Sequence, residues 1–317
     1  MRLRKVFSLM IVLTIIIGCC ILIFNRITLK DNQIALMIED PLYDAVLKRD
    51  ILSLMISYPE HIKDVTREED GKVYVILNSG RKILYDDKKT KNRWQKAGNP
   101  DIQDMLEQIY PLSDITEILP NNYNPGCVRI YPLLKEVYGA NKSQIQKNLV
   151  KVSIGYKFVE FNKQNNASIA LQSVMKELLP LARRSHKVYA AAFPCNGTYN
   201  YRLIGGTNRL SSHAFGIAID LNSNKYDYWR WSTREEGQKR LNSYPKEVVH
   251  AFEKYGFVWG GKWGNFDIMH YEYRPELIFK ARYFAEKPIL GLPWYDGLQN
   301  NQKAMEYVWL IEERLNG

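Results

Sequence analysis

The segment SSHAFGIAIDLN, residues 211–222, constrains the fold most, because an apolar run in it ends in an acid. An extended chain from Gly216 to Asp220 would alternate its side chains between two faces. The two isoleucines would face a core, and the other face would carry small residues and the Asp220 carboxylate. This predicts a strand with one face that carries only small side chains and Asp220, and it places His213 on the turn before the strand. Taken alone, Asp220 could instead be a buried capping carboxylate.

A second group of polar residues comes about 50 residues later, in DIMHYEY at positions 267–273. On a strand that starts at Met269, His270 and Glu272 would share a face. Asp267 would lie just before that strand.

The two segments together supply two imidazoles and one carboxylate, from His213, Asp220 and His270. Three such ligands without a thiolate suit a catalytic zinc ion, which keeps its fourth position for water. Asp267 could then act as general base and acid, and Glu272 could orient a ligand. Spacing alone leaves a metal site and a structural role for these residues both open. The other histidines are interpreted as surface residues: His61, His186 and His250.

These residues resemble the M15 family of zinc peptidases, which groups D-alanyl-D-alanine carboxypeptidases and L-alanyl-D-glutamate endopeptidases. The family pattern is S-x-H-x-x-G-x-A-x-D, followed downstream by an acid, two residues and a histidine. The chain matches it at Ser211, His213, Gly216, Ala218, Asp220, Asp267 and His270. The stretch GFVWGGKW before FDIMHYEY also resembles the family, and the resemblance covers residues 120–285.

The resemblance implies that His213, Asp220 and His270 bind Zn²⁺ and that Asp267 is the catalytic base. Arg202 matches the place where the family carries an arginine, with Arg209 as a rival. Its rigid guanidinium would suit a substrate carboxylate or a developing oxyanion. Ser211 is expected to fix the turn that presents His213.

The first 30 residues form a separate segment, in which positions 7–24 are an uncharged run of 18 residues after three basic ones. Such a run is just long enough to span a bilayer, with its positive start inside. Three interpretations remain open: an uncleaved anchor, a lipoprotein lipidated at Cys19, and a cleaved signal peptide. All three put the bulk of the chain outside the cytoplasm. A Cys127–Cys195 disulfide and two free thiols are both open there.

The remaining periodicity predicts an α+β fold, a small antiparallel sheet flanked by helices, with four regions: 1–30, 31–115, 120–285 and 286–317. Region 31–115 is an α/β part of unknown role, and 286–317 is a helical extension. The elements expected are helices at 31–65, 101–109, 131–138, 142–150, 168–184 and 245–255, two tail helices after 275, a hairpin at 72–85, a loop at 86–100, a strand pair at 151–161, and strands at 187–193, 257–259 and 268–273.

The net charge of +10 favours an anionic partner, but Lys and Arg are scattered and no nucleic-acid-binding motif accompanies them. We therefore expect an exported enzyme of the bacterial cell membrane that acts on peptidoglycan peptides and binds no nucleic acid. Two alternatives stay open. The chain could be a non-catalytic wall-binding module with a structural zinc, or a sensor in which residues 31–115 bind a partner.

Overall fold

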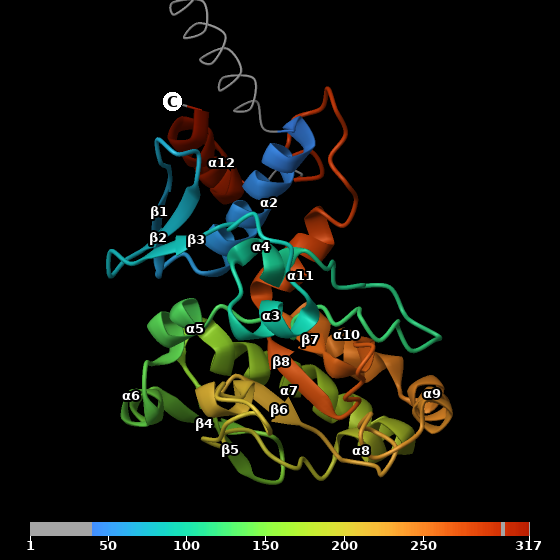
Figure 1. The fold of residues 1–317 in the computed structure, drawn as a ribbon. Helices are drawn as coiled ribbons and strands as arrows, with labels where there is room; N and C mark the ends of the chain where they lie inside the picture. The colour runs from blue at the N-terminus through green and yellow to red at the C-terminus, as the bar shows by residue number, and fades with distance from the viewer. Residues whose placement is uncertain (1–39, 299–301, 317) are drawn as a thin grey trace, which may run out of the picture. The chain divides into compact units, whose positions relative to one another are not determined.

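The computed structural model describes residues 40–298 and 302–316 (Figure 1). Contacts divide the chain into two units, Met1–Asp44 and Ala45–Gly317. The predicted membrane segment at 7–24 lies outside the described residues. Among the residues that are described, no helix is both long enough and apolar enough to cross a membrane.

The fold is α+β, with helices around three small antiparallel sheets. The sheets have the strand orders β1-β2-β3, β4-β5 and β6-β8-β7. The strands are β1 (Ile62–Arg67), β2 (Val73–Leu77), β3 (Lys82–Leu84), β4 (Leu149–Ser153), β5 (Phe158–Asn162), β6 (Ala218–Asp220), β7 (Phe257–Trp259) and β8 (His270–Tyr273). The helices are α2 (Pro41–Ser57), α3 (Arg93–Gly98), α4 (Ile102–Leu106), α5 (Tyr131–Tyr138), α6 (Lys142–Lys147), α7 (Ala167–Arg184), α8 (His186–Ala192), α9 (Arg234–Ser243), α10 (Lys246–Lys254), α11 (Pro275–Tyr283) and α12 (Gln302–Asn316), with 3₁₀ turns η1 (Gln164–Asn166), η2 (Ser212–Phe215) and η3 (Gly260–Lys262).

The β6-β8-β7 sheet packs through β7 against α10 and α11, beside which Figure 1 draws it. Helix α10 begins after Pro245 and ends before Gly256, whose φ of 88° glycine adopts without strain. Its Val248, Val249 and Phe252 are buried, and Phe252 stacks on Tyr271 of β8. The sheet that carries the second polar segment is therefore anchored in the main core.

Residues 45–115 are tied to this core by buried hydrogen bonds. Tyr110 donates to Glu253 of α10 at 2.5 Å, and Lys280 of α11 donates to the Leu106 carbonyl at 2.6 Å. Tyr58 donates to Glu276 at 2.7 Å. The expected division of roles between 31–115 and 120–285 stays a prediction, since these contacts say nothing about function.

Several expected elements are confirmed: the hairpin of β2 and β3, the strand pair of β4 and β5, and helices α4, α5, α7, α10, α11 and α12. The predicted strand at 187–193 is wrong, because these residues form helix α8. Three alanines favour the helix, and the Ser185 hydroxyl caps it by accepting from the Val188 N–H.

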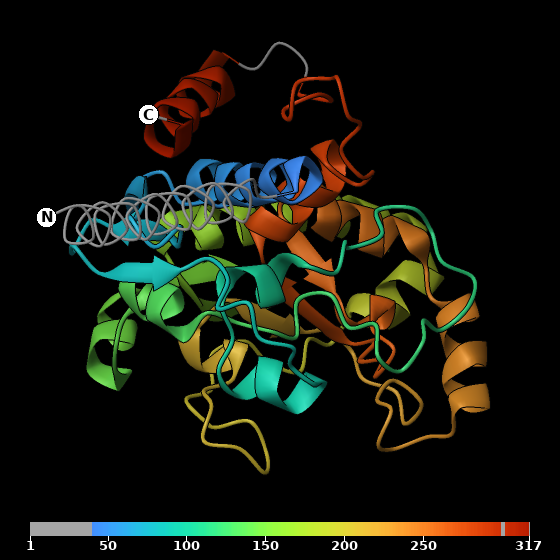
Figure 2. The same ribbon diagram turned by 45° about the horizontal axis from the view of Figure 1, so that its top comes forward.

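Three other predictions need correction, and one helix was not predicted. The helix expected at 31–65 ends at Ser57 within its described part, and β1 starts at Ile62. The helix expected at 142–150 ends at Lys147, and the loop expected at 86–100 contains α3. Helix α9 was not predicted, because it is almost wholly polar. It lies at the periphery in Figure 2 and begins with a capping box of Thr233 and Glu236.

The two described cysteines are free thiols, so the Cys127–Cys195 disulfide is not formed. Burial raises the pKa of both thiols to about 11. The Cys195 thiol donates instead to the Asp220 carbonyl at 3.2 Å.

Candidate metal centre

His213 is presented by the 3₁₀ turn η2, which precedes β6, as the sequence predicted. The Ser211 hydroxyl caps this turn by accepting from the His213 N–H at 3.3 Å, as expected for Ser211. Gly216 ends it with φ of 69°. A Cβ at Gly216 would meet a Leu149 methyl at 2.7 Å, so glycine is needed there for both backbone and space. The strand predicted from Gly216 therefore begins only at Ala218.

Asp220 and His270 face each other across two neighbouring strands. The antiparallel register of β6 and β8 pairs Asp220 directly with His270 and Ala218 with Glu272. Opposite residues in such a ladder have their side chains about 5 Å apart on the same face. The sheet thus brings together two residues that are 50 positions apart in the sequence.

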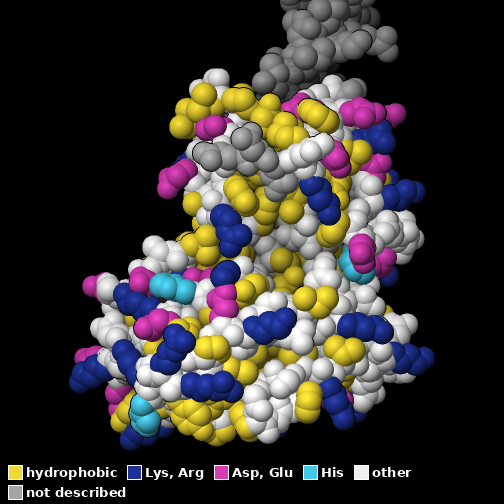
Figure 3. Space-filling model, turned by 180° about the vertical axis from the view of Figure 1, so that it is seen from behind, with side chains coloured by type: hydrophobic (Ala, Val, Ile, Leu, Met, Phe, Trp, Pro, Cys, Tyr) yellow, Lys and Arg dark blue, Asp and Glu magenta, His cyan; other side chains and the backbone are white. Residues whose placement is uncertain are grey.

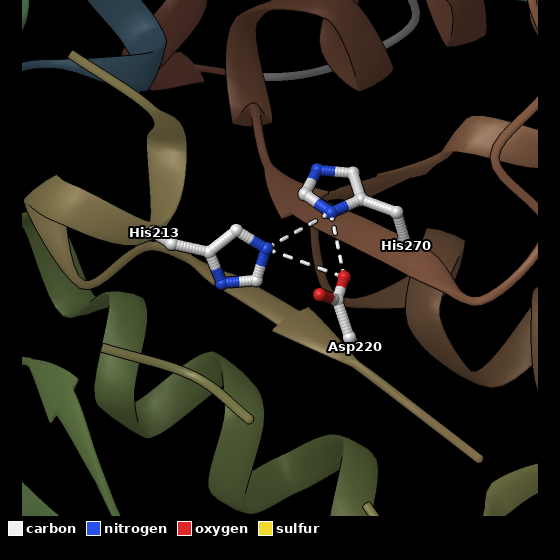
Figure 4. A group of neighbouring side chains, drawn as sticks. All are labelled: His213, Asp220 and His270. Atoms are coloured by element: carbon white, nitrogen blue, oxygen red, sulfur yellow. Dashed lines mark hydrogen bonds and ion pairs between the residues drawn. The ribbon is translucent and has the colours of Figure 1, made fainter. Parts of the chain in front are cut away.

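The side chains of His213, Asp220 and His270 converge on one point, as Figure 4 shows. His213 Nε2 lies 3.2 Å from His270 Nδ1 and 3.2 Å from Asp220 Oδ1. His270 Nδ1 lies 2.9 Å from the same oxygen. The three atoms form a nearly regular triangle.

The remaining nitrogen of each imidazole faces an acceptor on the side away from this triangle. His213 Nδ1 lies 2.6 Å from the Thr198 carbonyl, and His270 Nε2 lies 3.7 Å from Glu272 Oε2. If both of these nitrogens carry the proton, the lone pairs of the other two point into the triangle. That is the arrangement in which neighbours of metal-binding histidines fix their tautomers.

The dimensions of the triangle fit a metal ion. An ion about 2.0–2.2 Å from tetrahedral ligands holds the ligand atoms roughly 3.3–3.5 Å apart, close to the distances seen here. Two imidazole lone pairs and a carboxylate oxygen at such distances repel one another unless a cation or protons lie among them. The Asp220 side chain is 22% exposed, so the triangle is open on one side. These residues could therefore hold a metal.

The side chains of the cluster also shift one another's pKa values. Burial alone would raise the pKa of Asp220, but hydrogen bonds from His213 and His270 outweigh it and hold the pKa far below its usual value. Burial alone would lower the pKa of His270, but its hydrogen bond to Asp220 and the Glu272 carboxylate 3.7 Å away raise it to about 10. Positive charge is thus strongly favoured at this point of the molecule.

Asp267 lies between η3 and β8, three residues before His270. Its backbone pairs with Tyr228 in an isolated antiparallel bridge, and its N–H donates to the Gly260 carbonyl at 2.9 Å. Its Oδ1 is buried and has no hydrogen-bond partner. Burial raises the pKa of Asp267 to about 7, and the positive charges of His270 and Arg202 oppose that rise. An unpartnered carboxyl group that titrates near neutrality is well suited to take and return a proton.

The two candidate arginines differ in what their guanidinium groups contact. Arg209 donates to the Ala97 carbonyl at the end of α3, at 2.8 Å. Arg202 is exposed, and its charge acts on Asp267. Its backbone carbonyl accepts from the Ser211 N–H at 3.1 Å, which ties it to the turn that presents His213. Of the two, Arg202 is free to meet a ligand.

Two partners of the site were not predicted from the sequence. The Thr198 carbonyl belongs to the backbone, so no side-chain pattern could have indicated it. Arg129 contacts Glu272 from 143 positions away, and neither composition nor spacing carries a signal for that pair.

Residues 205–273 match the family model described as D-alanyl-D-alanine carboxypeptidase, a model of M15 peptidases. The matched segment contains His213, Asp220, Asp267 and His270, while Arg202 lies just before it. No curated protein and no solved structure matches the chain significantly. Residues 205–273 are thus similar to M15 peptidases, and this similarity supports the interpretation of the chain as an M15 peptidase.

Proposed function

We propose that the chain is an exported zinc peptidase that hydrolyses peptide bonds in peptidoglycan stem peptides. The observation that carries this proposal is the triangle of His213, Asp220 and His270, together with the buried, unpartnered carboxyl oxygen of Asp267, whose pKa responds to the charges of His270 and Asp220. The matched family segment, whose description is an activity on D-alanyl-D-alanine, supports the choice of substrate class.

Zinc is the metal that the donor set favours. Two imidazole nitrogens and one carboxylate oxygen, without a thiolate, are a common ligand set of catalytic zinc. A zinc ion bound there would act as a Lewis acid and would lower the pKa of a water molecule.

Asp267 would transfer the protons of the reaction, and Arg202 would bind an anion. Asp267 would take the proton from the attacking water and pass it to the amine that leaves. Arg202 would pair with a carboxylate of the substrate or with the oxyanion that forms on the scissile carbonyl. The rigid, permanently charged guanidinium suits either anion.

The substrate and the location are argued from charge and from the N-terminal segment. An anionic cell wall suits a chain with net charge +10, and Figure 3 shows Lys and Arg side chains spread over the face that it draws. The run at 7–24 would anchor the chain in the bacterial cell membrane, by a span or a lipid, with residues 120–285 outside the cytoplasm. The bond cut would be the terminal D-Ala–D-Ala bond or the internal L-Ala–D-Glu bond.

Hydrolysis of defined stem peptides tests this proposal. The full chain, purified in detergent, is incubated with muropeptides that end in D-Ala–D-Ala or lack it, with and without a chelator. Mass spectrometry of the products then identifies the bond. We expect cleavage that stops with the chelator and returns with Zn²⁺. Metal binding without any cleavage would overturn the proposal in favour of a non-catalytic wall-binding module.

The role of Arg202 is tested separately with a matched pair of variants. Arg202→Met should lower kcat/KM about 100-fold, the usual effect of losing one oxyanion partner. Arg209→Met removes the same charge from a nearby position, where the guanidinium donates a hydrogen bond to the Ala97 carbonyl. It should leave kcat nearly unchanged. Equal losses in both variants would show that general positive charge, not Arg202, supports catalysis.

A further inference from the structure

The Glu272 carboxylate lies between the metal cluster and a pair of buried arginines. Its side chain is fully buried on β8, two residues from His270 and on the same face of the strand. Arg129 binds it with a two-pronged contact: Nε donates to Oε1 at 2.8 Å, and Nη2 donates to Oε2. The oxygen Oε2 that Arg129 holds is the one that faces His270 Nε2 at 3.7 Å.

The second arginine of the pair has a carboxylate of its own. Arg274 Nη1 lies 3.5 Å from Glu272 Oε1, but its Nε donates to Glu276 Oε1 at 2.5 Å. The other oxygen of Glu276 accepts from Tyr58 at 2.7 Å. Since buried charges are costly unless they are paired, Glu276 is the main partner of Arg274, and Arg129 makes the shorter, bidentate contact with Glu272.

Backbone contacts hold both guanidinium groups in place. Arg129 Nη1 donates to the Cys127 carbonyl at 3.1 Å, and Arg274 Nη1 donates to the Gly126 carbonyl at 2.7 Å. Trp263, whose ring lies 5.6 Å from that of His270, donates to the Pro125 carbonyl at 2.6 Å. The segment 125–129 is thereby fastened to the strand that carries His270.

From these contacts we propose that Arg129 is a positioning residue for the metal centre. Its planar fork fixes the plane of the Glu272 carboxylate, and that carboxylate holds the Nε2–H form and the orientation of His270. The Nδ1 lone pair then points into the ligand triangle. Arg129 touches neither the ligand atoms nor the reacting atoms, and it lies 76 residues before the matched family segment, which starts at residue 205. The inference rests on the proposed metal site but not on which bond is cut.

Metal affinity is the direct test, measured on the full chain by competition for Zn²⁺ with a chromogenic chelator. Partners of metal-bound histidines typically change metal affinity about 10–100-fold. We expect that loss for Arg129→Met and for Glu272→Gln, with a smaller loss for Arg129→Lys, which keeps the charge but not the fork. The visible spectrum of the Co²⁺-loaded protein should shift in Arg129→Met, because the His270 ligand is reoriented.

A matched control distinguishes a loss of His270 orientation from a general loss of protein stability. Glu253 and Lys262 form an equally buried ion pair at 2.6 Å that contacts neither histidine of the cluster. Glu253→Gln should lower the melting temperature and leave the Zn²⁺ affinity within about twofold, far below the range for ligand partners. If Glu253→Gln weakens Zn²⁺ binding as much as Arg129→Met does, the positioning role is refuted.

A double variant covers the case in which Arg129→Met folds poorly. Apolar residues often replace a buried ion pair without loss of stability. Arg129→Met combined with Glu272→Leu should therefore regain stability but not metal affinity. Wild-type affinity and an unchanged Co²⁺ spectrum in the double variant would overturn this inference alone. Failure of the wild-type chain to bind Zn²⁺ would instead overturn the proposed metal site, and this inference with it.

Discussion

The described part of the chain contains two groups of three potential ligands, and they differ in what lies among them. One is the triangle of His213, Asp220 and His270, and the other consists of Asp86, Asp87 and Asp101. In the second group, the ammonium of Lys91 lies 3.0 Å from Asp87 and 2.7 Å from Asp101. In the first group, no lysine or arginine contact with the triangle is found among the described residues.

The comparison shows that closeness of acidic groups does not by itself indicate a metal site. Lys91 is only 7% exposed and also meets Asp104 at 2.6 Å. Burial alone would lower the pKa of Lys91, but the carboxylates around it outweigh burial and raise the pKa above its usual value. The protein supplies its own ammonium group to the aspartate group, whereas the histidine triangle has only imidazole protons or a metal ion to balance its carboxylate.

The largest expected effect follows from removing one member of each group. His213→Ala should weaken Zn²⁺ binding by more than about 100-fold, beyond the loss seen for partners of ligands, and should abolish hydrolysis. Asp87→Ala should leave the zinc content unchanged. Zinc content after gel filtration, measured by atomic emission, checks both. Equal zinc loss in the two variants would contradict the proposal that the triangle binds zinc and the aspartate group does not.

Asp267→Asn should lower kcat about 100- to 10,000-fold, because amide groups cannot take the proton of the attacking water. The zinc content should stay at the wild-type level, since Asp267 is not one of the converging ligands. Single-turnover hydrolysis of a muropeptide gives the rate, and metal analysis of the same sample gives the content. Unchanged hydrolysis would remove Asp267 from the mechanism.

Lys91→Met should affect stability rather than metal binding. It leaves the buried carboxylate of Asp101 without its ammonium partner and Asp104 with only Lys96 at 3.7 Å, and an unpaired buried charge costs about 3 kcal/mol or more of unfolding free energy. Urea unfolding measures this loss. The control is Lys82→Met, which breaks an exposed pair with Glu68 and should lower the unfolding free energy much less, because exposed ion pairs contribute little to stability. If both cost the same, Lys91 is not the internal cation of the aspartate group.

The converging residues could be predicted because each lies in a short segment with a local pattern, and the resemblance to M15 peptidases joined the two segments into one ligand set. Asp220 and His270 each sit in a short stretch whose alternation indicates a strand, and pairing of the two strands places them opposite each other. The turn before β6 was harder to predict. A run of apolar residues suggested that the strand starts at Gly216, but the positive φ of Gly216 places a turn there instead.

Other features depend on contacts that a local pattern does not encode. The apolar stretch of α8 fits a buried strand as well as a buried helix, and alanine propensity with the Ser185 cap decides between them. The pair of Arg129 and Glu272 joins residues 143 positions apart. No periodicity links such residues, so the environment of His270 could be found only in three dimensions.

The smallest expected effect concerns the stability of the metal-free chain and has the opposite sign to the catalytic loss. The pKa of Asp267 is raised to about 7 by burial, whereas an unfolded aspartate titrates near 3.9. Between these pH values the folded state binds more protons than the unfolded state, so the unfolding free energy falls as the pH rises. The amide introduced by Asp267→Asn does not ionise, so this variant should be more stable than the wild type at pH 8 and nearly equal to it at pH 4. Urea unfolding of the two chelator-treated proteins at both pH values measures this difference. A difference that does not change with pH would contradict the raised pKa. A difference that grows with pH would mean that the chain keeps at its candidate active site a carboxyl group that costs it stability.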